Sequence, residues 1–293
     1  MTYSTLRVDR GADQGLISAG DEPVLYVAQV KVTIGRPGSL IWRWVNASPG
    51  EWVNSGVANG STVTIPPEYG RVSFAGDYRL EPINPLQVIV PGNILKMDVG
   101  ISVVIALDSN FSSAGQNTAF LNSIMEPTMQ GLAAHLDSIP IPLHPGIIFD
   151  PTPLSSALAE IESGMDAALS ENLSYLRLVG AFGQRGMSSA GNADDIIGIG
   201  VTALVPIDSG WELVPRVLGV TPESLGMNSD WTRVHTKDKD LGLLGHLRIP
   251  IWAGFVSDKK VTQDLPLQGI LTTNDWIITN MNQYTLGVTA QLG

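Results

Sequence analysis

The stretch from residue 97 to residue 176 contains no lysine and no arginine, although it holds nine carboxylates. Within it the spacing of apolar residues changes from a β-strand pattern to the three-and-four spacing of amphipathic helices, and the β pattern returns near residue 196. Strands and helices bury different sets of positions, so this change of period limits the possible folds. We expect a mainly β protein with a helical insertion at residues 108–180.

The first expected helix covers about residues 112–136. Its apolar residues recur at spacings of three and four between Phe120 and Leu136, which is the pattern of a helix with one buried face. Pro127 lies inside this pattern. Proline lacks a backbone N–H and clashes with the preceding turn, so we expect either a kinked helix or two separate helices.

The second expected helix covers about residues 152–179. Thr152 can cap its N-terminus, a proline follows in the first turn, and Gly180 suits its end. Leu158 and Ile161 belong to its apolar stripe. We therefore expect both side chains to be buried.

Short β-branched runs lie on both sides of the insertion, and Pro, Gly and Asn separate them. The expected strands are residues 24–34, 39–45, 61–65, 71–75, 86–90, 94–107, 196–206, 211–220, 244–256, 267–279 and 284–292. Many short strands at regular spacing are typical of a sandwich or barrel. The pattern favours a β-sandwich or jelly-roll-like body with the two helices between its β-rich halves.

The first 21 residues lack apolar periodicity and contain three glycines. We expect residues 1–21 to form an extended N-terminal arm or a disordered tail. We expect residues 22–293 to form a single large β-rich domain, and a chain of this length can bury a core of that size.

Charged residues are scarce in this chain. They make up 15% of it, against roughly 25% in an average soluble protein. Lysine is rarer than arginine, 6 against 11, and subunit interfaces favour arginine and disfavour lysine. Two interpretations follow, a surface largely covered by neighbouring subunits or an ordinary surface rich in neutral polar residues.

The net charge of −11 is concentrated in the middle of the chain. Residues 94–232 carry 4 basic and 15 acidic side chains, whereas the two flanking segments are nearly neutral. We find no Lys/Arg cluster that could neutralise several phosphates, so direct nucleic-acid binding is not expected. The chain also lacks cysteine, which excludes thiolate chemistry and Cys-ligated zinc.

The tryptophans near the N-terminal end form a repeated pattern. The letters WVNA at 44–47 are echoed by WVNS at 52–55, with a Ser-Pro-Gly turn between them. This arrangement predicts a hairpin with cross-strand aromatic residues, and a strand would place Trp42 and Trp44 on one face. Trp42, Trp44 and Trp52 could be core or interface anchors, or a platform on which sugar rings stack.

Residues 108–112 read DSNFS, after an apolar strand and before a helix. This resembles the D-x-S-x-S metal site of von Willebrand factor A-type domains, with Asn110 in place of the first serine. The resemblance makes Asp108, Asn110 and Ser112 the candidate cation ligands. That family alternates strands and helices throughout, and this chain does not. We favour the alternative that Asp108, Ser109 and Ser112 cap the following helix.

The other motifs do not indicate a nucleotide-binding, metal-binding or catalytic site. Residues 198–203 fit the letters of a dinucleotide-binding fingerprint, but they lie inside a β run rather than at a strand-to-helix turn. The four histidines show no metal-binding spacing, and His135 lies on the apolar side of its helix. The P-loop and Gly-x-Ser-x-Gly motifs are absent. We expect no cofactor and no enzymatic activity.

Together these features favour a structural, self-assembling protein, and specifically a viral or phage capsid subunit. Its partners would be copies of itself and a second coat protein. We expect Arg248, Lys259 and Lys260, with Trp42, Trp44 and Trp52, to lie at interfaces, because the C-terminal segment carries the nearest basic residues to the acidic middle.

Two other functions remain open. One is a β-sandwich hydrolase or carbohydrate-binding protein that uses the face of Trp42, Trp44 and Trp52. The other is a cation-dependent adhesion module that acts through Asp108. We see no signal peptide and no apolar run of the roughly 20 residues that span a bilayer. The expected location is the virion for a coat protein, and otherwise the cytoplasm.

Overall fold

The computed structural model describes residues 1–11, 22–34, 36–52, 56–74, 97–108, 114–138, 152–172, 195–206, 232–240, 246–256, 260–268 and 283–291. Its strands are β1 (Thr2–Arg10), β2 (Pro23–Ile34), β3 (Ile41–Trp44), β4 (Thr62–Thr64), β5 (Met97–Asp108), β6 (Asp195–Pro206), β7 (Thr232–Asp240), β8 (His246–Val256), β9 (Val261–Gln268) and β10 (Gln283–Ala290). Its helices are α1 (Pro67–Gly70), α2 (Ala114–Ser138) and α3 (Thr152–Asn172). The expectation of a mainly β fold with a helical insertion is confirmed.

The ten described strands belong to one sheet, in the order β3-β2-β5-β6-β8-β9-β10-β1-β4, and β7 pairs with β8. Strand β8 connects the two parts of this sheet. From Ile251 onward it runs parallel to β6, whereas Arg248 pairs with Gln268 of β9. Pro250 lies between these two pairings. A strand that exchanges one partner for another in this way forms the corner between two packed sheet halves.

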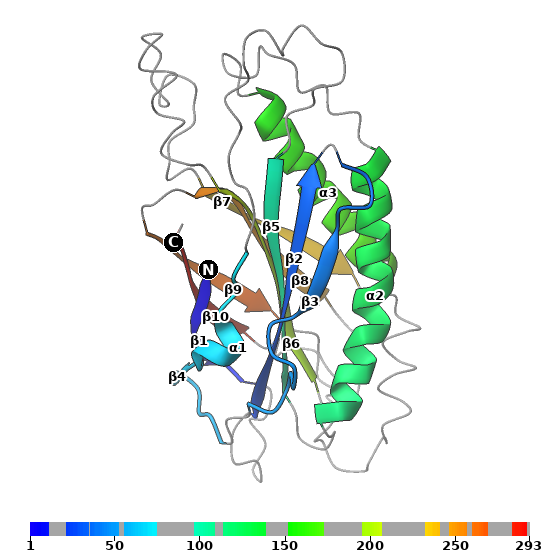
Figure 1. Cartoon of the computed structure of the whole chain (residues 1–293). Helices are drawn as coiled ribbons and strands as arrows, with labels where there is room; N and C mark the ends of the chain where they lie inside the picture. Colours follow the sequence, from blue (N-terminus) through cyan, green and yellow to red (C-terminus); the bar gives the residue numbers. More distant parts are fainter. Residues whose placement is uncertain are drawn as a thin grey trace, which may run out of the picture.

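The result is a three-layer arrangement. Helices α2 and α3 cover one face of the half that contains β2, β5, β6 and β8, and the half that contains β9, β10, β1 and β4 lies on the opposite face (Figure 1). The jelly-roll part of the expectation is not confirmed. A jelly roll is built from two Greek keys of antiparallel strands, whereas β6 and β8 pair in parallel.

Two hydrophobic cores fill the spaces between the layers. In the helix-side core, alternate residues of β2, β5, β6 and β8 contact α2 and α3; Ile101, Leu121 and Ile161 are typical members and are fully buried. In the inter-sheet core, the other face of the same strands contacts β1, β9 and β10, for example through Leu265 and Leu286. Strands covered on both faces read as nearly continuous apolar runs, which explains the apolar run of β5.

The two expected helices are present. Helix α2 is a single helix with Pro127 inside it. The alternative expectation, that Pro127 separates two helices, is therefore wrong. Met125 and Met129, on either side of the proline, are both buried in the helix-side core, and this continuous apolar face holds the helix against the sheet. Helix α3 begins at Thr152 as expected and is described to residue 172.

The expected N-terminal arm is wrong for residues 2–10. These residues form β1, which lies between β10 and β4, and the side chains of Tyr3, Leu6 and Val8 are fully buried. A register shift between Tyr3 and Thr5 breaks the alternation of apolar residues, so a strict period-two pattern cannot detect the strand. The rest of the expected arm, residues 12–21, lies outside the described residues.

Several other strand expectations need correction. Strands β7 and much of β9 were not expected, because their sequences are polar and charged. The expected strand at 71–75 is absent from its described part, where Arg71 forms only an isolated bridge with Thr2. The expected strands at 86–90 and 211–220 lie outside the described residues, as do residues 269–279 of the strand expected at 267–279.

Candidate functional site

A row of polar residues crosses the first half of the sheet on the side of the inter-sheet core. The register pairs Arg43 with Gln29, Gln29 with Ser102, Ser102 with Thr202, and Thr202 with Trp252. Directly paired residues share one face of a sheet. The row therefore runs from an exposed arginine at the edge to Ser102, Thr202 and Trp252, which are all fully buried.

The two ends of this polar row are held by side-chain hydrogen bonds. At the outer end, with the Gln29 amide oxygen turned toward Arg43, the guanidinium donates to that oxygen at 2.8 and 3.0 Å. At the inner end, the Tyr3 hydroxyl of β1 lies 3.1 Å from the Thr202 hydroxyl. Tyr3 also interacts with Ser102. The polar row thus joins β1 to the opposite sheet half.

The chemistry of the inner end is that of neutral hydroxyls. Burial raises the pKa of Tyr3 to about 12, and its interactions with the Ser102 and Thr202 hydroxyls oppose this rise. A tyrosine with this pKa keeps its proton near neutral pH and serves as a donor rather than a base. The row contains no carboxylate or histidine that could activate a hydroxyl as a nucleophile. Its geometry suits a structural role, in which the buried hydrogen bond between Tyr3 and Thr202 fixes how the two halves pack. The Ser102 hydroxyl and the Trp252 indole N–H are buried there without a hydrogen-bond partner.

Trp42 and Trp44 lie on one face of β3, as expected, and this face is the helix side. Their rings meet edge to face with centroids 5.7 Å apart, and Tyr26 meets Trp44 in the same manner at 5.9 Å. The Trp44 indole N–H donates to the side-chain oxygen of Asn122 in α2 at 2.8 Å. These contacts anchor the edge strand β3 to α2.

Trp52 is not part of the same face. It packs against the inter-sheet core beside Tyr69, with ring centroids 6.4 Å apart. The described ladder of β3 is with β2, so the expected hairpin between the segments of Trp44 and Trp52 is wrong within the described residues. The echo in the sequence reflects two separate anchors on opposite sides of the sheet. A sugar platform made of all three tryptophans is not assembled.

The candidate cation site falls largely outside the described residues. Asp108 ends β5, and its backbone pairs with Asp195 of β6, but Asn110 and Ser112 lie in the segment that is not described. Among the residues that the structure describes, no group of three or more His, Asp or Glu side chains could hold a metal ion.

The expected basic interface is only partly described. Lys260 is exposed just before β9, whereas Lys259 lies outside the described residues. Arg248 lies in β8 opposite Asp238 of β7. The facing of these residues toward an acidic neighbour stays a prediction.

The residues 198–203 lie within β6, as expected, and the structure gives their glycines a packing role. A Cβ atom at Gly198 would lie 2.7 Å from Cβ of Leu267 in β9, and one at Gly200 would lie 3.1 Å from the same side chain. Real Cβ atoms essentially never approach within 3.0 Å, so Gly198 leaves no room for a side chain, and the contact at Gly200 would be tighter than most real ones. The glycines therefore let β9 pass close to β6, and they do not form a nucleotide-binding turn.

His135 connects the two long helices. Its Nε2 lies 3.5 Å from a carboxylate oxygen of Glu160 in α3, and its ring lies over Gly164, where a Cβ atom would be 2.5 Å from Cδ2. The side chain is one-third exposed, so its position on the apolar side of α2 does not bury it completely.

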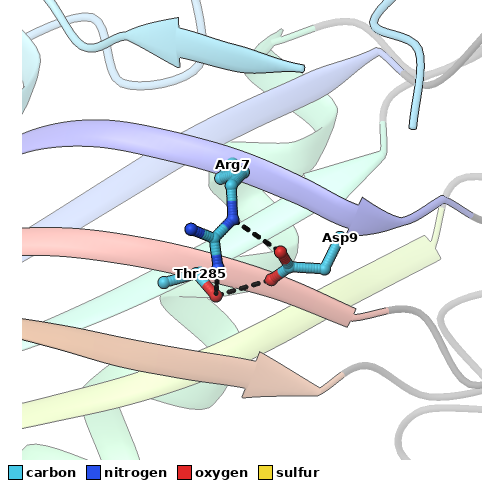
Figure 2. Close-up of polar contacts among 3 residues, drawn as sticks. All are labelled: Arg7, Asp9 and Thr285. Atoms are coloured by element: carbon cyan, nitrogen blue, oxygen red, sulfur yellow. Dashed lines mark hydrogen bonds and ion pairs between the residues drawn. The ribbon is translucent and has the colours of Figure 1, made fainter. Parts of the chain in front are cut away.

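The outer face of β1 and β10 is polar, and a small network lies at its centre (Figure 2). Arg7 Nε donates to Asp9 at 2.6 Å and Arg7 Nη2 donates to Thr285 at 3.2 Å, while the Thr285 hydroxyl donates to Asp9 at 2.5 Å. The hydrogen bond and the charge of Asp9 raise the pKa of Arg7. These three side chains satisfy one another, and exposed networks of this kind contribute little to stability.

The outer edge of β3 is the most unusual surface feature. Strand β3 ends the sheet order on its side, and Ile41 is 65% exposed, the most exposed large apolar residue of the described chain. Sequence reasoning placed a strand here but did not identify it as an edge. Only the pairing pattern shows that.

Comparisons with protein-family models, curated proteins and solved structures found no match to this chain. Among the described helices, none is long and apolar enough to span a membrane.

Proposed function

We propose that this protein is a structural subunit that assembles with copies of itself, and that the assembly is a viral or phage capsid. The observation that carries the proposal is the exposed apolar edge of β3. An edge strand offers unpaired N–H and C=O groups to another chain, and soluble monomers usually protect such edges with charges, prolines or covering segments.

The strands at the two ends of the helix-covered half, β3 and β7, differ in how their edges are protected against pairing with another chain. Among the described strands β7 pairs with β8 alone, and its sequence TRVHTKDKD contains three basic and two acidic residues. This is the charge-based protection that discourages pairing between molecules. Strand β3 has the sequence IWRW, which combines exposed apolar surface with a single charge. An edge of this composition supports association.

The composition supports the same proposal. A low share of charged residues and a preference for arginine over lysine are typical of surfaces that become interfaces. The described residues also lack a metal-binding group, and the buried polar row has no activating base. A role in packaging nucleic acid directly is not part of the proposal, because the net charge is −11 and DNA or RNA would be repelled.

The proposal is tested by the size of the purified protein in solution. Multi-angle light scattering over a hundredfold concentration range, followed by negative-stain microscopy, should detect oligomers that grow into rings, sheets or shells. Assembly should be reversible on dilution. A monomer at every concentration and salt condition would refute the proposal.

A further inference from the structure

We propose that β3 pairs antiparallel with β3 of a second copy, about a two-fold axis at Trp42. This inference deepens the proposed function and rests on it. The second copy is the chosen occupant because β3 is self-complementary in one register, as the hydrogen-bond directions and the charge of its residues show.

The free backbone groups of β3 can be assigned from one hydrogen bond. The Val45 N–H donates to the carbonyl oxygen of Val27 in β2 at 2.8 Å. Backbone groups alternate in direction along a strand, so Arg43 and Ile41 also direct theirs toward β2. Trp42 and Trp44 therefore direct their N–H and C=O groups to the outer edge.

The direction of these groups and the faces of the strand limit the possible registers. A two-fold axis perpendicular to the sheet keeps the two faces on the same sides, so each residue must pair with one of the same parity. Three registers of this kind bring the short strands together, centred on Ile41, on Trp42 or on Arg43. Leu40 directly precedes β3, and when the alternation is extended to it, the register centred on Trp42 forms three outward pairs: Trp42 with Trp42, and Leu40 with Trp44 in both directions. Each of the other two registers forms two such pairs.

The charge of Arg43 also distinguishes the registers. Centring on Arg43 would place two arginines in a pair with Cα atoms only about 4.5 Å apart, where like charges oppose pairing. Centring on Trp42 instead places Ile41 opposite Arg43 of the second copy. The aliphatic part of the arginine side chain can then cover Ile41, which is the most exposed large apolar residue of the described chain.

The area of this contact sets its strength. Two four-residue edges bury less than the roughly 800 Å² per partner of a standard stable interface. The pairing is therefore weak and concentration-dependent by itself, which suits a subunit that uses several contacts in one assembly.

The register can be tested by disulfide trapping, because the chain contains no cysteine. Ile41 and Arg43 are both exposed, so Ile41→Cys and Arg43→Cys should fold normally. In the proposed register these two positions face each other at a Cα separation of about 4.5 Å, which is within the range of disulfides. Oxidising an equimolar mixture of the two variants should give a covalent dimer, whereas each variant alone should not.

Every outcome of this experiment is informative. A dimer from Ile41→Cys alone or from Arg43→Cys alone would overturn the proposed register. Unchanged assembly without any disulfide in the mixture would overturn the β3 contact and leave the proposed function standing. A monomer throughout would overturn the proposed function, and the inference with it.

A pair of lysine substitutions provides a matched control. Ile41→Lys places a charge opposite Arg43 of the second copy, and we expect the concentration for half-maximal association to rise roughly tenfold or more. Val234→Lys makes the same change in β7, where Val234 is 36% exposed, and should leave association unchanged. Equal effects of the two variants would show that general charge, not the β3 edge, controls association.

Discussion

Replacing Tyr3 with phenylalanine tests whether the N-terminal segment is part of the folded core. Tyr3 lies in β1, is fully buried, and its hydroxyl lies 3.1 Å from that of Thr202 on β6. The two residues are 199 positions apart in the chain. Tyr3→Phe removes only the hydroxyl and preserves the ring that fills the core.

The expected cost follows from the buried hydrogen bond. A typical intramolecular hydrogen bond contributes about 1 kcal/mol, and leaving a buried partner unsatisfied costs about 1–3 kcal/mol. Thr202 is fully buried, so Tyr3→Phe should lower the free energy of unfolding by about 1–3 kcal/mol. A tyrosine in an exposed tail would give a change within about 0.5 kcal/mol.

The pH dependence gives a second readout. Burial raises the pKa of Tyr3 to about 12, above the value of about 10 in an unfolded chain. The unfolded state therefore loses this proton first as the pH rises. The contribution of the neutral hydroxyl to stability is fully present below pH 10 and is lost between pH 10 and pH 12. Its size is roughly 2–3 kcal/mol.

Urea unfolding followed by fluorescence, at several pH values from 8 to 11.5, measures both effects. The free-energy difference between wild type and Tyr3→Phe should be largest near pH 8 and should shrink above pH 10. Tyr69→Phe is the matched control, because Tyr69 is half-buried beside Trp52, and it should change stability by less than about 0.5 kcal/mol. Equal stability of Tyr3→Phe and wild type across this pH range would refute the placement of β1 in the core.

Three further predictions concern packing and charge. Gly198→Ala should destabilise the protein by about 1–3 kcal/mol in thermal or urea unfolding, because the new Cβ atom would clash with β9. Its control is Gly115→Ala, where a Cβ atom would have nothing within 4 Å, and this change should be neutral or stabilising. Equal effects of the two changes would contradict the close approach of β9 to β6. Ile161→Ala should cost about 2–5 kcal/mol, since Ile161 is fully buried between α3 and the sheet, and a loss below about 0.5 kcal/mol would show that α3 does not pack there. Replacing both Lys259 and Lys260 with Glu should slow assembly, as measured by stopped-flow light scattering. The effect should be strongest at low salt, because charge contacts are screened within about 10 Å at 0.1 M salt. A wild-type assembly rate across the salt range would exclude charge complementarity.

The sequence alone predicted the elements whose residues follow one clear period. Helix α2 and the start of α3 follow from the three-and-four spacing of apolar residues, and β2, β5 and β6 follow from long β-branched runs. The helical insertion between two β-rich parts also followed, because a change of period is a local property of the chain. The low share of charged residues and the absence of cysteine also limited the possible chemistry, because composition is read directly from the sequence.

Elements that depend on partners far along the chain could not be found this way. Strand β1 was missed because a register shift beside Tyr3 interrupts its alternation, and its burial is supplied by β4 and β10. Strand β7 reads as a charged loop, and only its pairing with β8 makes it a strand. The echo of Trp44 by Trp52 suggested a hairpin, although the fold places the two residues in different cores.

In the candidate site, too, some features follow from the sequence and others only from the tertiary structure. Trp42 and Trp44 share a face because side chains alternate along any strand, and the sequence determined this much. The polar row from Arg43 to Trp252 brings together residues of five strands, and the register of each pairing decided its membership. The exposure of Ile41 was also decided by tertiary structure, because a strand becomes an edge only when the sheet ends there.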